Sequence, residues 1–466
     1  MLKSYFGVRV FRSKLFNDQT INLNTMKFQN LFKTLLIILS VVIVSSCSDD
    51  DDTTFDENST TIAQFVANNP NYSSLLAALE KAELVETLSS TTGSFTVFAP
   101  NNAAFDAFLT DLGVTLDDLT KEDLTPILLN HVIGSEVTSS QLSTGYVSNE
   151  SGVSTYINTS SGVVINGDVT VTTADIDQSN GVIHAVDKVI AVPTLLDFVT
   201  ADPDLSSLGI VATADVAAAL SGDTTLTLLA PTDAAFGGVD LSGLSDDEVE
   251  NTLLNHVIAG ENLSSGLATG YGNTLATYGG TDNNLSIYIN TSDGVTFNGT
   301  SSVQTADVVA SNGVMHIVNA VITLPTVVTF AVADADNFST LVAALTDLTP
   351  NTDFAQILST TGEAPAPFTV FAPTNTAFAA ITVPDNEDDI VPILNYHVVG
   401  GQNVRSTDLV DGTVETLNGD VTINASAPSV QGGGNDTASN IIVVDVQAIN
   451  GVIHAIDQVL LPPTMM

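Results

Sequence analysis

Basic residues are scarce in this chain. Its 466 residues include 10 Lys and Arg against 53 Asp and Glu, which gives a formal net charge of −43 and a pI near 4.1. Because nucleic-acid binding needs a patch of Lys or Arg to neutralise phosphates, we expect no nucleic-acid partner. Six of the ten basic residues precede Cys47, so the rest of the chain is more acidic still. Such a surface favours solubility in a saline exterior.

Cysteine and aromatic residues are also few. Cys47 is the only cysteine, there is no tryptophan, and there are eight tyrosines. A single cysteine excludes disulfides within one chain. The shortage of aromatic rings leaves few platforms on which a sugar could stack, which argues against a dedicated carbohydrate-binding protein.

The N-terminal segment has the layout of a secretory signal. Residues 27–47, KFQNLFKTLLIILSVVIVSSC, begin with basic residues, continue with a short apolar run and end with small residues. We therefore expect a signal peptide at about 26–46, with residues 1–25 as an upstream extension. Cys47, preceded by Val44-Ser45-Ser46, resembles the lipidated cysteine of a bacterial lipoprotein box. This resemblance implies that a lipid on Cys47 is the only membrane attachment.

The residues after Cys47 are strongly acidic. The run SDDDD at 48–52 resembles the export signal that sends lipoproteins of Bacteroidota-type bacteria to the outer face of the outer membrane. We expect residues 47–60 to be the lipidated cysteine and an acidic tether. The resemblance implies a surface-exposed outer-membrane lipoprotein.

Internal repetition is the strongest signal in the chain. Three motifs recur in the same order, and each occurs three times. They are SFTVFAPNNAAF (94–105), TLTLLAPTDAAF (225–236) and PFTVFAPTNTAF (367–378); ILLNHVI (127–133), TLLNHVI (252–258) and ILNYHVV (393–399); and NGVIHAVDKVI (180–190), NGVMHIVNAVI (312–322) and NGVIHAIDQVL (450–460). Repeats of this length are domains rather than solenoid units, which predicts three domains at 61–193, 194–325 and 326–466.

Each repeat mixes helical and strand patterns. The opening segments have apolar residues at helical spacing, and later runs such as VVINGDVTVTTADI alternate as strands do. FTVFA predicts a short buried strand, after which Asn101, Thr232 and Thr374 are expected to cap a helix. The fold class is therefore α+β.

The three motifs together resemble the fasciclin domain, and the resemblance covers essentially everything from residue 61 onward. It implies a β-sheet wedge with packed helices in each repeat and a role in cell adhesion or matrix contact. In animal members a Tyr-His segment contributes to integrin binding. Only Tyr396-His397 matches that segment, because the first two repeats have Asn130-His131 and Asn255-His256. Tyr396 and His397 are thus a candidate adhesion segment.

All six histidines lie in the motifs, two in each repeat: His131 and His184, His256 and His316, His397 and His454. Hydrolase-type catalysis would need a nucleophile, yet there is no G-x-S-x-G elbow and no cysteine beyond Cys47. A transition-metal site would need recurring ligands at short spacing, and none is present. We expect no catalytic residues, metal ions or cofactors.

A structural role suits the histidines better. Asn180-Gly181, Asn312-Gly313 and Asn450-Gly451 are typical two-residue hairpin turns. Such turns would set Asp175 opposite Val186, Asp307 opposite Val318 and Asp445 opposite Ile456. Each aspartate would then lie diagonally from its histidine, His184, His316 or His454. We predict a partly buried hydrogen bond from each of these histidines to the aspartate or to nearby backbone.

These observations favour a non-enzymatic surface protein for adhesion or matrix contact. Its partner would be an extracellular protein or polysaccharide. The short connections at Pro193-Thr194 and Pro325-Thr326 predict a semi-rigid row of domains that could bind through several weak sites. The alternative is a carbohydrate-binding lipoprotein that captures glycans at the cell surface.

Overall fold

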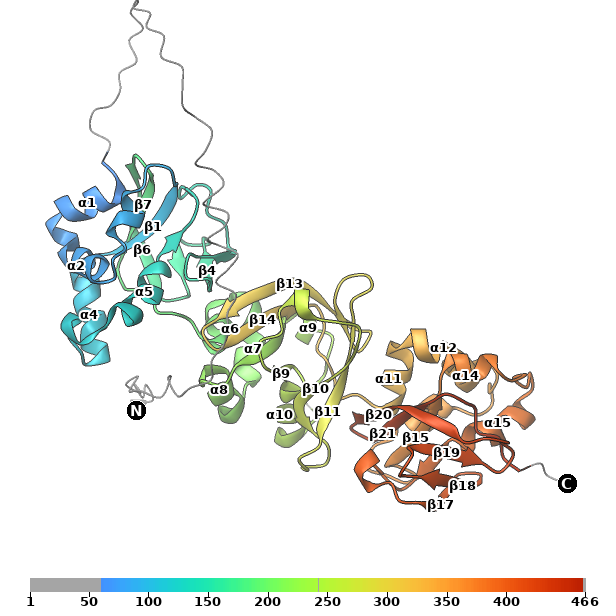
Figure 1. The fold of residues 1–466 in the computed structure, drawn as a ribbon. Coiled ribbons are helices and arrows are strands. Elements are labelled where there is room, and N and C mark those ends of the chain that lie inside the picture. Colours follow the sequence, from blue (N-terminus) through green and yellow to red (C-terminus); the bar gives the residue numbers. More distant parts are fainter. Residues whose placement is uncertain (1–59, 242, 464–466) are drawn as a thin grey trace, which may run out of the picture.

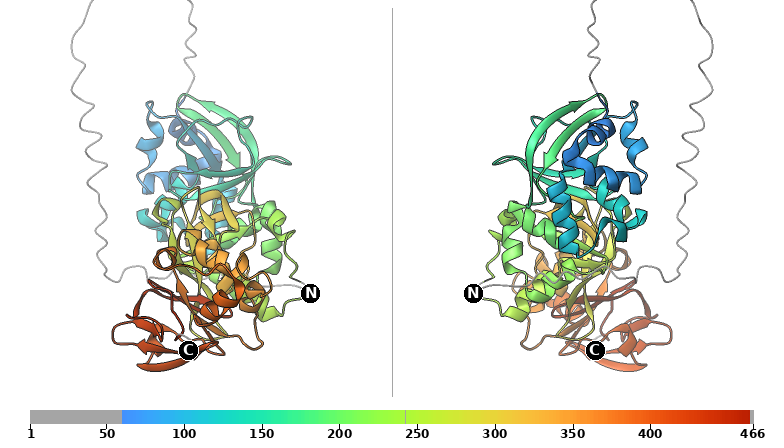
Figure 2. Two further views of the ribbon diagram at one scale, coloured as in Figure 1. Left: turned by 90° about the vertical axis from the view of Figure 1, so that its right-hand side faces the viewer. Right: turned by 90° about the vertical axis from the view of Figure 1, so that its left-hand side faces the viewer.

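The computed structural model describes residues 60–241 and 243–463 as three α+β domains that follow one another in chain order (Figure 1). Figure 2 views the row from its two ends, with the third domain nearest in the left panel and the first domain nearest in the right. Cys47, the signal segment and most of the acidic tether lie outside the described residues. The expectations about lipidation and export therefore remain predictions.

The first domain is a seven-stranded sheet with helices on one side. The strand order is β2-β1-β7-β6-β5-β4-β3, and only β1 and β7 pair in parallel. Its elements are α1 (Ile62–Asn68), η1 (Pro70–Tyr72), α2 (Ser73–Lys81), α3 (Val85–Ser89), β1 (Phe95–Pro100), α4 (Asn102–Leu112), η2 (Leu116–Asp118), α5 (Lys121–Leu129), β2 (Val132–Ile133), β3 (Gly145–Ser148), β4 (Ser154–Asn158), β5 (Val164–Ile165), β6 (Val169–Gln178) and β7 (Gly181–Val186).

The second domain repeats this strand order and closes it into a barrel. The closing contact is a pairing between Thr274 of β10 and Ile258 of β9. Its elements are α6 (Leu195–Ala201), η3 (Pro203–Leu205), α7 (Ser206–Val211), α8 (Ala214–Ser221), β8 (Leu226–Pro231), α9 (Asp233–Phe236), α10 (Asp246–Leu254), β9 (Val257–Ala259), η4 (Ser264–Gly266), β10 (Gly270–Thr277), β11 (Asn284–Asn290), β12 (Thr296–Phe297), β13 (Ser301–Ala310) and β14 (Gly313–Val318).

The third domain again has seven strands in the equivalent order, β16-β15-β21-β20-β19-β18-β17. Its elements are α11 (Val327–Ala333), α12 (Ala335–Thr346), α13 (Phe354–Leu358), β15 (Phe368–Pro373), α14 (Asn375–Ala379), α15 (Glu387–Asn395), β16 (Val398–Gly400), η5 (Ser406–Asp408), β17 (Gly412–Thr416), β18 (Gly419–Asn424), β19 (Ser429–Gly432), β20 (Ser439–Ala448) and β21 (Gly451–Ile456).

Helix starts follow the sequence closely. Asn101, Thr232 and Thr374 are the N-caps of α4, α9 and α14, as predicted, and each side chain accepts a hydrogen bond from a backbone N–H in the first turn. The preceding strands β1, β8 and β15 are buried along nearly their whole length, which confirms the interpretation of the FTVFA motif.

Each sheet separates two apolar clusters. In the first domain, Ile183 of β7 packs with α1 and α5 on the helix side, whereas Phe98 and Val186 pack with Ile157 on the other side of the curled sheet. This division follows from the alternation of side chains along a strand. Because β7 is covered on both faces, all six of its residues are buried. The same arrangement recurs around β14 and β21.

The predicted hairpin register is wrong. The turn consists of Ser179 and Asn180, and Gly181 is already the first residue of β7, paired with Gln178. Val186 lies opposite Val171 rather than Asp175, because the turn comes one residue earlier than predicted and the register of β6 then shifts twice. The other repeats differ from the prediction in the same way: Val318 lies opposite Val303 rather than Asp307, and Ile456 opposite Ile441 rather than Asp445.

Asn180 occupies the second position of the turn rather than the predicted first, and its side chain makes three hydrogen bonds. Its amide nitrogen donates to the carbonyl oxygens of Leu88 and Ser90 at 2.8 and 3.0 Å, and its oxygen accepts from the backbone N–H of Ile62 at 2.9 Å. Asn180 therefore ties the helices to the sheet. Asn312 and Asn450 make the equivalent three bonds.

Consecutive domains are in direct contact. Tyr156 of β4 is buried in the helix-side cluster of the second domain, and Tyr288 of β11 is buried in that of the third. At the chain connections, the N–H of Ser311 donates to Pro193 and the N–H of Ile449 donates to Pro325, both at 2.8 Å. The short connections are thus hydrogen-bonded to the domain that follows.

No single helix among residues 60–241 and 243–463 is long and apolar enough to cross a membrane. One bent pair, α11 and α12, passes that test only when the two helices are taken together across their 119° bend.

Candidate functional site

One histidine of each repeat lies inside the curled sheet. His184 of β7 is fully buried beside Phe98, with the two ring centroids 5.5 Å apart. Its Nδ1 accepts the backbone N–H of Asp175 at 3.2 Å, and its Nε2 lies 3.0 Å from the carbonyl oxygen of Val137. Because Nδ1 accepts, Nε2 carries the proton and donates it to Val137. The ring is therefore a neutral bridge between two segments of backbone.

The other two repeats reproduce this bridge. His316 accepts from the N–H of Asp307 at 3.2 Å and lies 2.9 Å from the carbonyl oxygen of Asn262. His454 accepts from the N–H of Asp445 at 3.4 Å and lies 2.9 Å from that of Val404. The sequence predicted a bond from each histidine to its aspartate or to backbone. In the structure the bond comes from the backbone of that same aspartate.

The aspartate side chains have a separate task. Asp175, Asp307 and Asp445 lie at the strand bulge with φ of 58°, 60° and 59°, a left-handed conformation that is uncommon outside glycine. Their carboxylates accept from the backbone N–H of Ser139, Ser264 and Ser406, each at 2.7 Å. Hydrogen bonds from Ser139 hold the pKa of Asp175 below its ordinary value. The carboxylates therefore fix a loop rather than the imidazole.

The second histidine of each repeat follows a helix. His131 lies just after α5, with Nδ1 2.7 Å from the carbonyl oxygen of Ile127, while its Nε2 accepts the N–H of Ile190 at 2.8 Å. His256 and His397 make the same two contacts with their own repeats. Burial lowers the pKa of all three histidines to about 4, so they are neutral at pH 7.

The candidate adhesion segment lies in the interior of the third domain. Tyr396 is 0% exposed and His397 3%. The Tyr396 hydroxyl donates to the carbonyl oxygen of Asp420 and accepts the N–H of Gly433 at 3.0 Å. A receptor could reach this pair only if the segment opened. The adhesion role of Tyr396 and His397 stays a prediction, and their position favours a structural role.

Asparagine occupies the equivalent position in the first two repeats. Asn130 donates to the carbonyl oxygens of Ile190 and Ala191 at 3.1 and 3.0 Å, and Asn255 does the same in the second domain. In the third domain Asn435 contacts the neighbouring backbone instead: its amide donates to the carbonyl oxygen of Val459 and its oxygen accepts the N–H of Leu461, both at 2.8 Å. Tyr396 is thus a local replacement inside a packed core.

This arrangement offers no chemistry beyond structure. Both ring nitrogens of every histidine face backbone groups, so none is free to act as a base. Across residues 60–241 and 243–463, no three His, Cys, Asp or Glu side chains are grouped to hold a metal ion. The motifs therefore stabilise the domains and leave binding to the surfaces around them.

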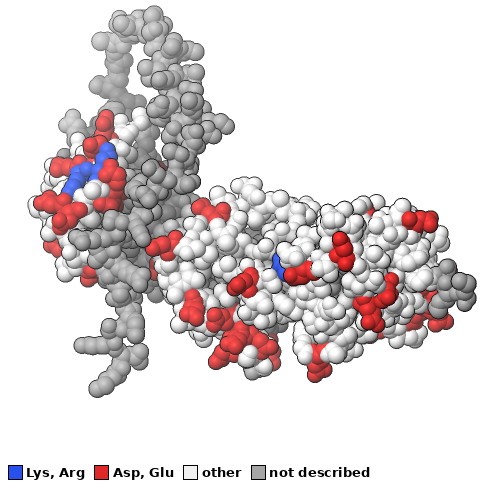
Figure 3. All heavy atoms as spheres, turned by 60° about the horizontal axis from the view of Figure 1, so that its bottom comes forward, with Lys and Arg blue, Asp and Glu red and all other residues white. Residues whose placement is uncertain are grey.

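The surface is acidic and its few cations are engaged locally. Lys81 donates to the carbonyl oxygen of Leu116 at 2.8 Å. The other three basic residues of the described chain pair with carboxylates: Lys121 with Glu83, Lys188 with Asp168, and Arg405 with Asp445. Figure 3 shows acidic side chains spread over one face, with few basic ones among them. Any partner that binds through charge would be cationic or bridged by cations.

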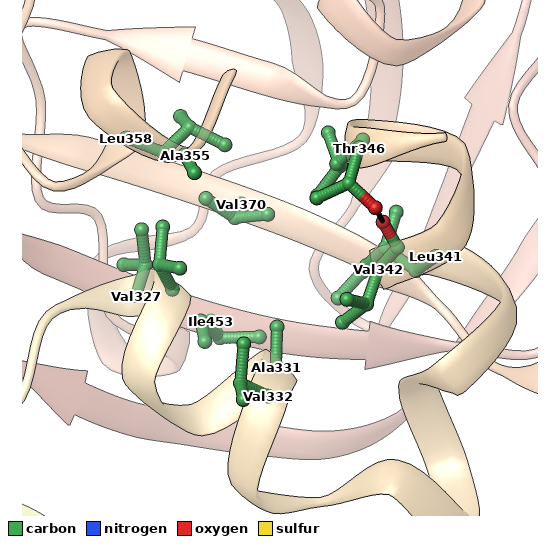
Figure 4. Close-up of a pocket in the computed structure, with 13 residues that line it drawn as sticks. Val327, Ala331, Val332, Leu341, Val342, Thr346, Ala355, Leu358, Val370 and Ile453 are labelled. Atoms are coloured by element: carbon green, nitrogen blue, oxygen red, sulfur yellow. Dashed lines mark hydrogen bonds between the residues drawn. The ribbon is translucent and has the colours of Figure 1, made fainter. Parts of the chain in front are cut away.

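An apolar cavity lies in the third domain between its opening helices and its sheet (Figure 4). It measures about 70 Å³, with Val327 and Ala331 of α11, Leu341 of α12, Val370 of β15 and Ile453 of β21 in its wall. An engineered cavity that binds benzene is about twice as large. Since almost no polar atom lines it, the cavity cannot orient a substrate.

Sequence reasoning missed the residues that join the domains. The hydroxyl of Tyr146 donates to Asp202 of the next domain at 2.8 Å, and that of Tyr271 donates to Asp334 at 2.9 Å. A signal was available: Thr-Gly-Tyr occurs at 144–146 and 269–271, whereas the third repeat has Asp-Gly-Thr at 411–413.

Comparison with known proteins agrees with this architecture. The chain is 29% identical over 423 residues to transforming growth factor-beta-induced protein ig-h3 of Oryctolagus cuniculus, covering 87% of this chain and 58% of that protein. It is 29% identical to human periostin over 79% of this chain and 44% of periostin. It therefore spans about half the length of these relatives.

Shorter relatives match single domains. Protein sll1483 of Synechocystis is 39% identical over 141 residues, which is 29% of this chain and 76% of that protein. A solved structure of the FAS1 domain pair from the insect cell adhesion molecule fasciclin I covers 53% of this chain and 92% of its own, with 20% identity and a TM-score of 0.35. The fasciclin domain model matches residues 70–193, 206–325 and 336–462. The chain therefore belongs to the fasciclin-domain family and carries three such domains in tandem.

Proposed function

We propose that this chain is a non-enzymatic surface protein that mediates adhesion or contact with extracellular matrix. The observation that carries the proposal is that the polar groups of the motif histidines are all engaged within their own domains. The three domains thus act as scaffolds, and their variable outer surfaces are what remains to bind a partner. Membership of a family that includes ig-h3 and periostin supports an extracellular role.

The proposed attachment is a lipid on Cys47, followed by the acidic tether. In this arrangement the three domains project from the outer membrane of a Bacteroidota-like bacterium. Support comes from the sequence alone: a signal-like segment, the single cysteine and the SDDDD run.

The proposed partner is an extracellular protein or polysaccharide that is cationic or bridged by cations. The local pairing of all four basic side chains in the described residues favours this charge preference. Three domains held in a row can engage several weak sites at once, which raises the overall affinity through effective concentration.

Beads coated with the full chain test this proposal. We expect the beads to retain cells of the source organism, with less retention at high salt because screening weakens charge-dependent contacts. Beads coated with the heat-denatured chain, which has the same charge, are the control.

A glycan array separates the alternative function. Tight binding to one glycan, together with no retention of cells, would replace adhesion by glycan capture. Equal retention by the native and denatured coatings would reject a specific adhesion surface.

A further inference from the structure

The two joints between domains are one interface used twice. A head surface on one domain meets a tail surface on the next, and the residues are equivalent in both joints. The head residues are Tyr146, Ser154, Tyr156 and Gly167 in the first joint, and Tyr271, Ser286, Tyr288 and Gly299 in the second; the tail residues are Phe198, Ala201 and Asp202, and Phe330, Ala333 and Asp334.

The aromatic contacts match closely. The ring of Tyr146 meets Phe198 edge-on at a centroid distance of 5.5 Å, and that of Tyr271 meets Phe330 at 5.7 Å. Each of these tyrosines also lies beside a second one, at 4.9 Å for Tyr156 and 5.1 Å for the equivalent Tyr288. Burial, together with the nearby Asp334, raises the pKa of Tyr288 to about 12. The hydroxyls therefore remain protonated at pH 7.

Backbone contacts match as well. Ser154 Oγ accepts the N–H of Val309 at 3.0 Å, and Ser286 Oγ accepts that of Gln447 at 2.9 Å. A Cβ on Gly167 would lie 3.0 Å from Cα of Ala201, so glycine allows the close approach of the two domains. The joint therefore combines shape, aromatic packing and buried hydrogen bonds.

A joint of this kind does not by itself limit how many domains can dock in a row. The head and tail surfaces differ from each other, so the contact is heterologous and can repeat as long as a free head meets a free tail. Among the described residues, no other domain lies on the tail of the first domain or on the head of the third. Unless these ends differ from the joints, separate molecules would join end to end.

Both ends do differ. In the first domain, Asn68 and Asn69 occupy the positions of Ala201 and Asp202, after the equivalent Phe65. Asn69 keeps the local cap, because its oxygen accepts the N–H of Asn71 at 3.1 Å as Asp202 does with Asp204 at 3.0 Å. The negative charge that receives the tyrosine hydroxyl is lost, and the larger Asn68 replaces the small Ala201 that meets Gly167.

The free head of the third domain has lost its tyrosines. Thr413 pairs with Thr422 in the register that joins Tyr146 to Tyr156, so the two threonines hold the tyrosine positions. Two pairs further, Asp420 stands where the first domain has Ser154. All three are exposed. Thus tyrosines are absent only from the head that has no partner, and the aspartate only from the tail that has none.

We infer that each fasciclin domain here carries a head-to-tail docking surface for another such domain, and that the altered residues at the two ends stop a second copy of the chain from adding. This inference is independent of what the outer surfaces bind.

The test restores the ends of the full chain. All samples carry Cys47→Ser, so that no lipid drives association. They are studied in non-ionic detergent at about 1 M salt, where the screening length of charge interactions is about 3 Å. Head-restored protein carries Thr413→Tyr, Asp420→Ser and Thr422→Tyr, and tail-restored protein carries Asn68→Ala and Asn69→Asp. Sedimentation velocity measures the size of the species.

We expect one-chain species for the parent protein, dimers when head-restored and tail-restored proteins are mixed, and longer chains when one molecule carries all five changes. A control protein carries Thr413→Phe and Thr422→Phe in the head in place of the two tyrosines. It lacks the tyrosine hydroxyls and should form fewer dimers with tail-restored protein. The inference is overturned if the molecule with all five changes stays a single chain, or if head-restored protein alone associates as strongly as the mixture.

Discussion

At the scale of single residues, each buried histidine bridges two segments of backbone through its two ring nitrogens. The imidazole of His184 accepts from one segment and donates to another, which a phenyl ring of similar size cannot do. The sequence predicted a structural histidine from its apolar surroundings. It could not predict that the donor is the N–H of Asp175, because this depends on the bulge and on the left-handed conformation of that residue.

Substitution of His184 by Phe tests this role. The change leaves the N–H of Asp175 and the carbonyl oxygen of Val137 without partners inside the first domain. We expect the free energy of unfolding of that domain to fall by at least about 2 kcal/mol, since each buried unpaired group costs about 1–3 kcal/mol. Thr173→Val, an exposed change on the neighbouring strand, is the control. An unchanged midpoint for His184→Phe in scanning calorimetry would reject the role.

The second set of histidines predicts a dependence on pH. His131, His256 and His397 have pKa values of about 4 in the folded chain against 6.5 when unfolded. Between these values the unfolded chain binds more protons, so stability is complete above pH 6.5 and falls as the pH drops toward 4. The loss is roughly 3 kcal/mol for each histidine.

Nuclear magnetic resonance can follow this titration directly. In the folded chain, the ring protons of the three residues should keep their neutral chemical shifts down to about pH 5. A midpoint near 6.5 for all three residues would contradict their burial. Spectra of the single variants His131→Gln, His256→Gln and His397→Gln assign the signals.

At the scale of elements, a parallel strand pair is the centre of each domain: β1 with β7, β8 with β14, and β15 with β21. The sequence identified both strands and the caps of the helices that follow, because local patterns determine them. The sequence could not predict the register of the hairpin, because Asn180 is held by Leu88 and Ser90, which are remote in sequence. Asn-Gly locally favours both positions of a two-residue turn. The long-range hydrogen bonds instead hold Asn180 at the second position, with Gly181 in the strand.

Gly181 provides a test of this pairing. Its φ is 137°, and a Cβ would lie 1.9 Å from the carbonyl oxygen of Phe95 in β1. Gly145 has a φ of 142° with nothing within 4 Å of an added Cβ. Both Ala variants carry backbone strain, so the difference between them isolates the clash.

We expect Gly181→Ala to be less stable than Gly145→Ala by more than about 3 kcal/mol in urea denaturation, because backbone on both sides must shift. Equal stabilities would show that β1 and β7 do not approach as closely as described.

At the scale of the whole molecule, the joints determine how the domains are presented. The three repeats and their α+β class were predicted from the sequence. The joints were not predicted, because the contact between Tyr146 and Asp202 is recognisable only once their domains are seen to be adjacent in space. Both Tyr–Asp hydrogen bonds lie where two domains meet.

Loss of the two joint hydroxyls should loosen the array. In Tyr146→Phe/Tyr271→Phe, the buried carboxylates of Asp202 and Asp334 each lose a hydrogen bond across the joint. We expect a larger radius of gyration in small-angle X-ray scattering, with circular dichroism unchanged. Tyr278→Phe, which lies away from both joints, should leave the scattering as it is. Identical curves for all three proteins would show that the hydroxyls do not hold the domains together.

Attachment of a deletion strain to a surface coated with extracellular matrix tests the adhesion function most directly. We predict that the strain attaches less than its parent, that the wild-type gene restores attachment, and that a Cys47→Ala version does not. Attachment of the deletion strain at the level of its parent would contradict the adhesion function.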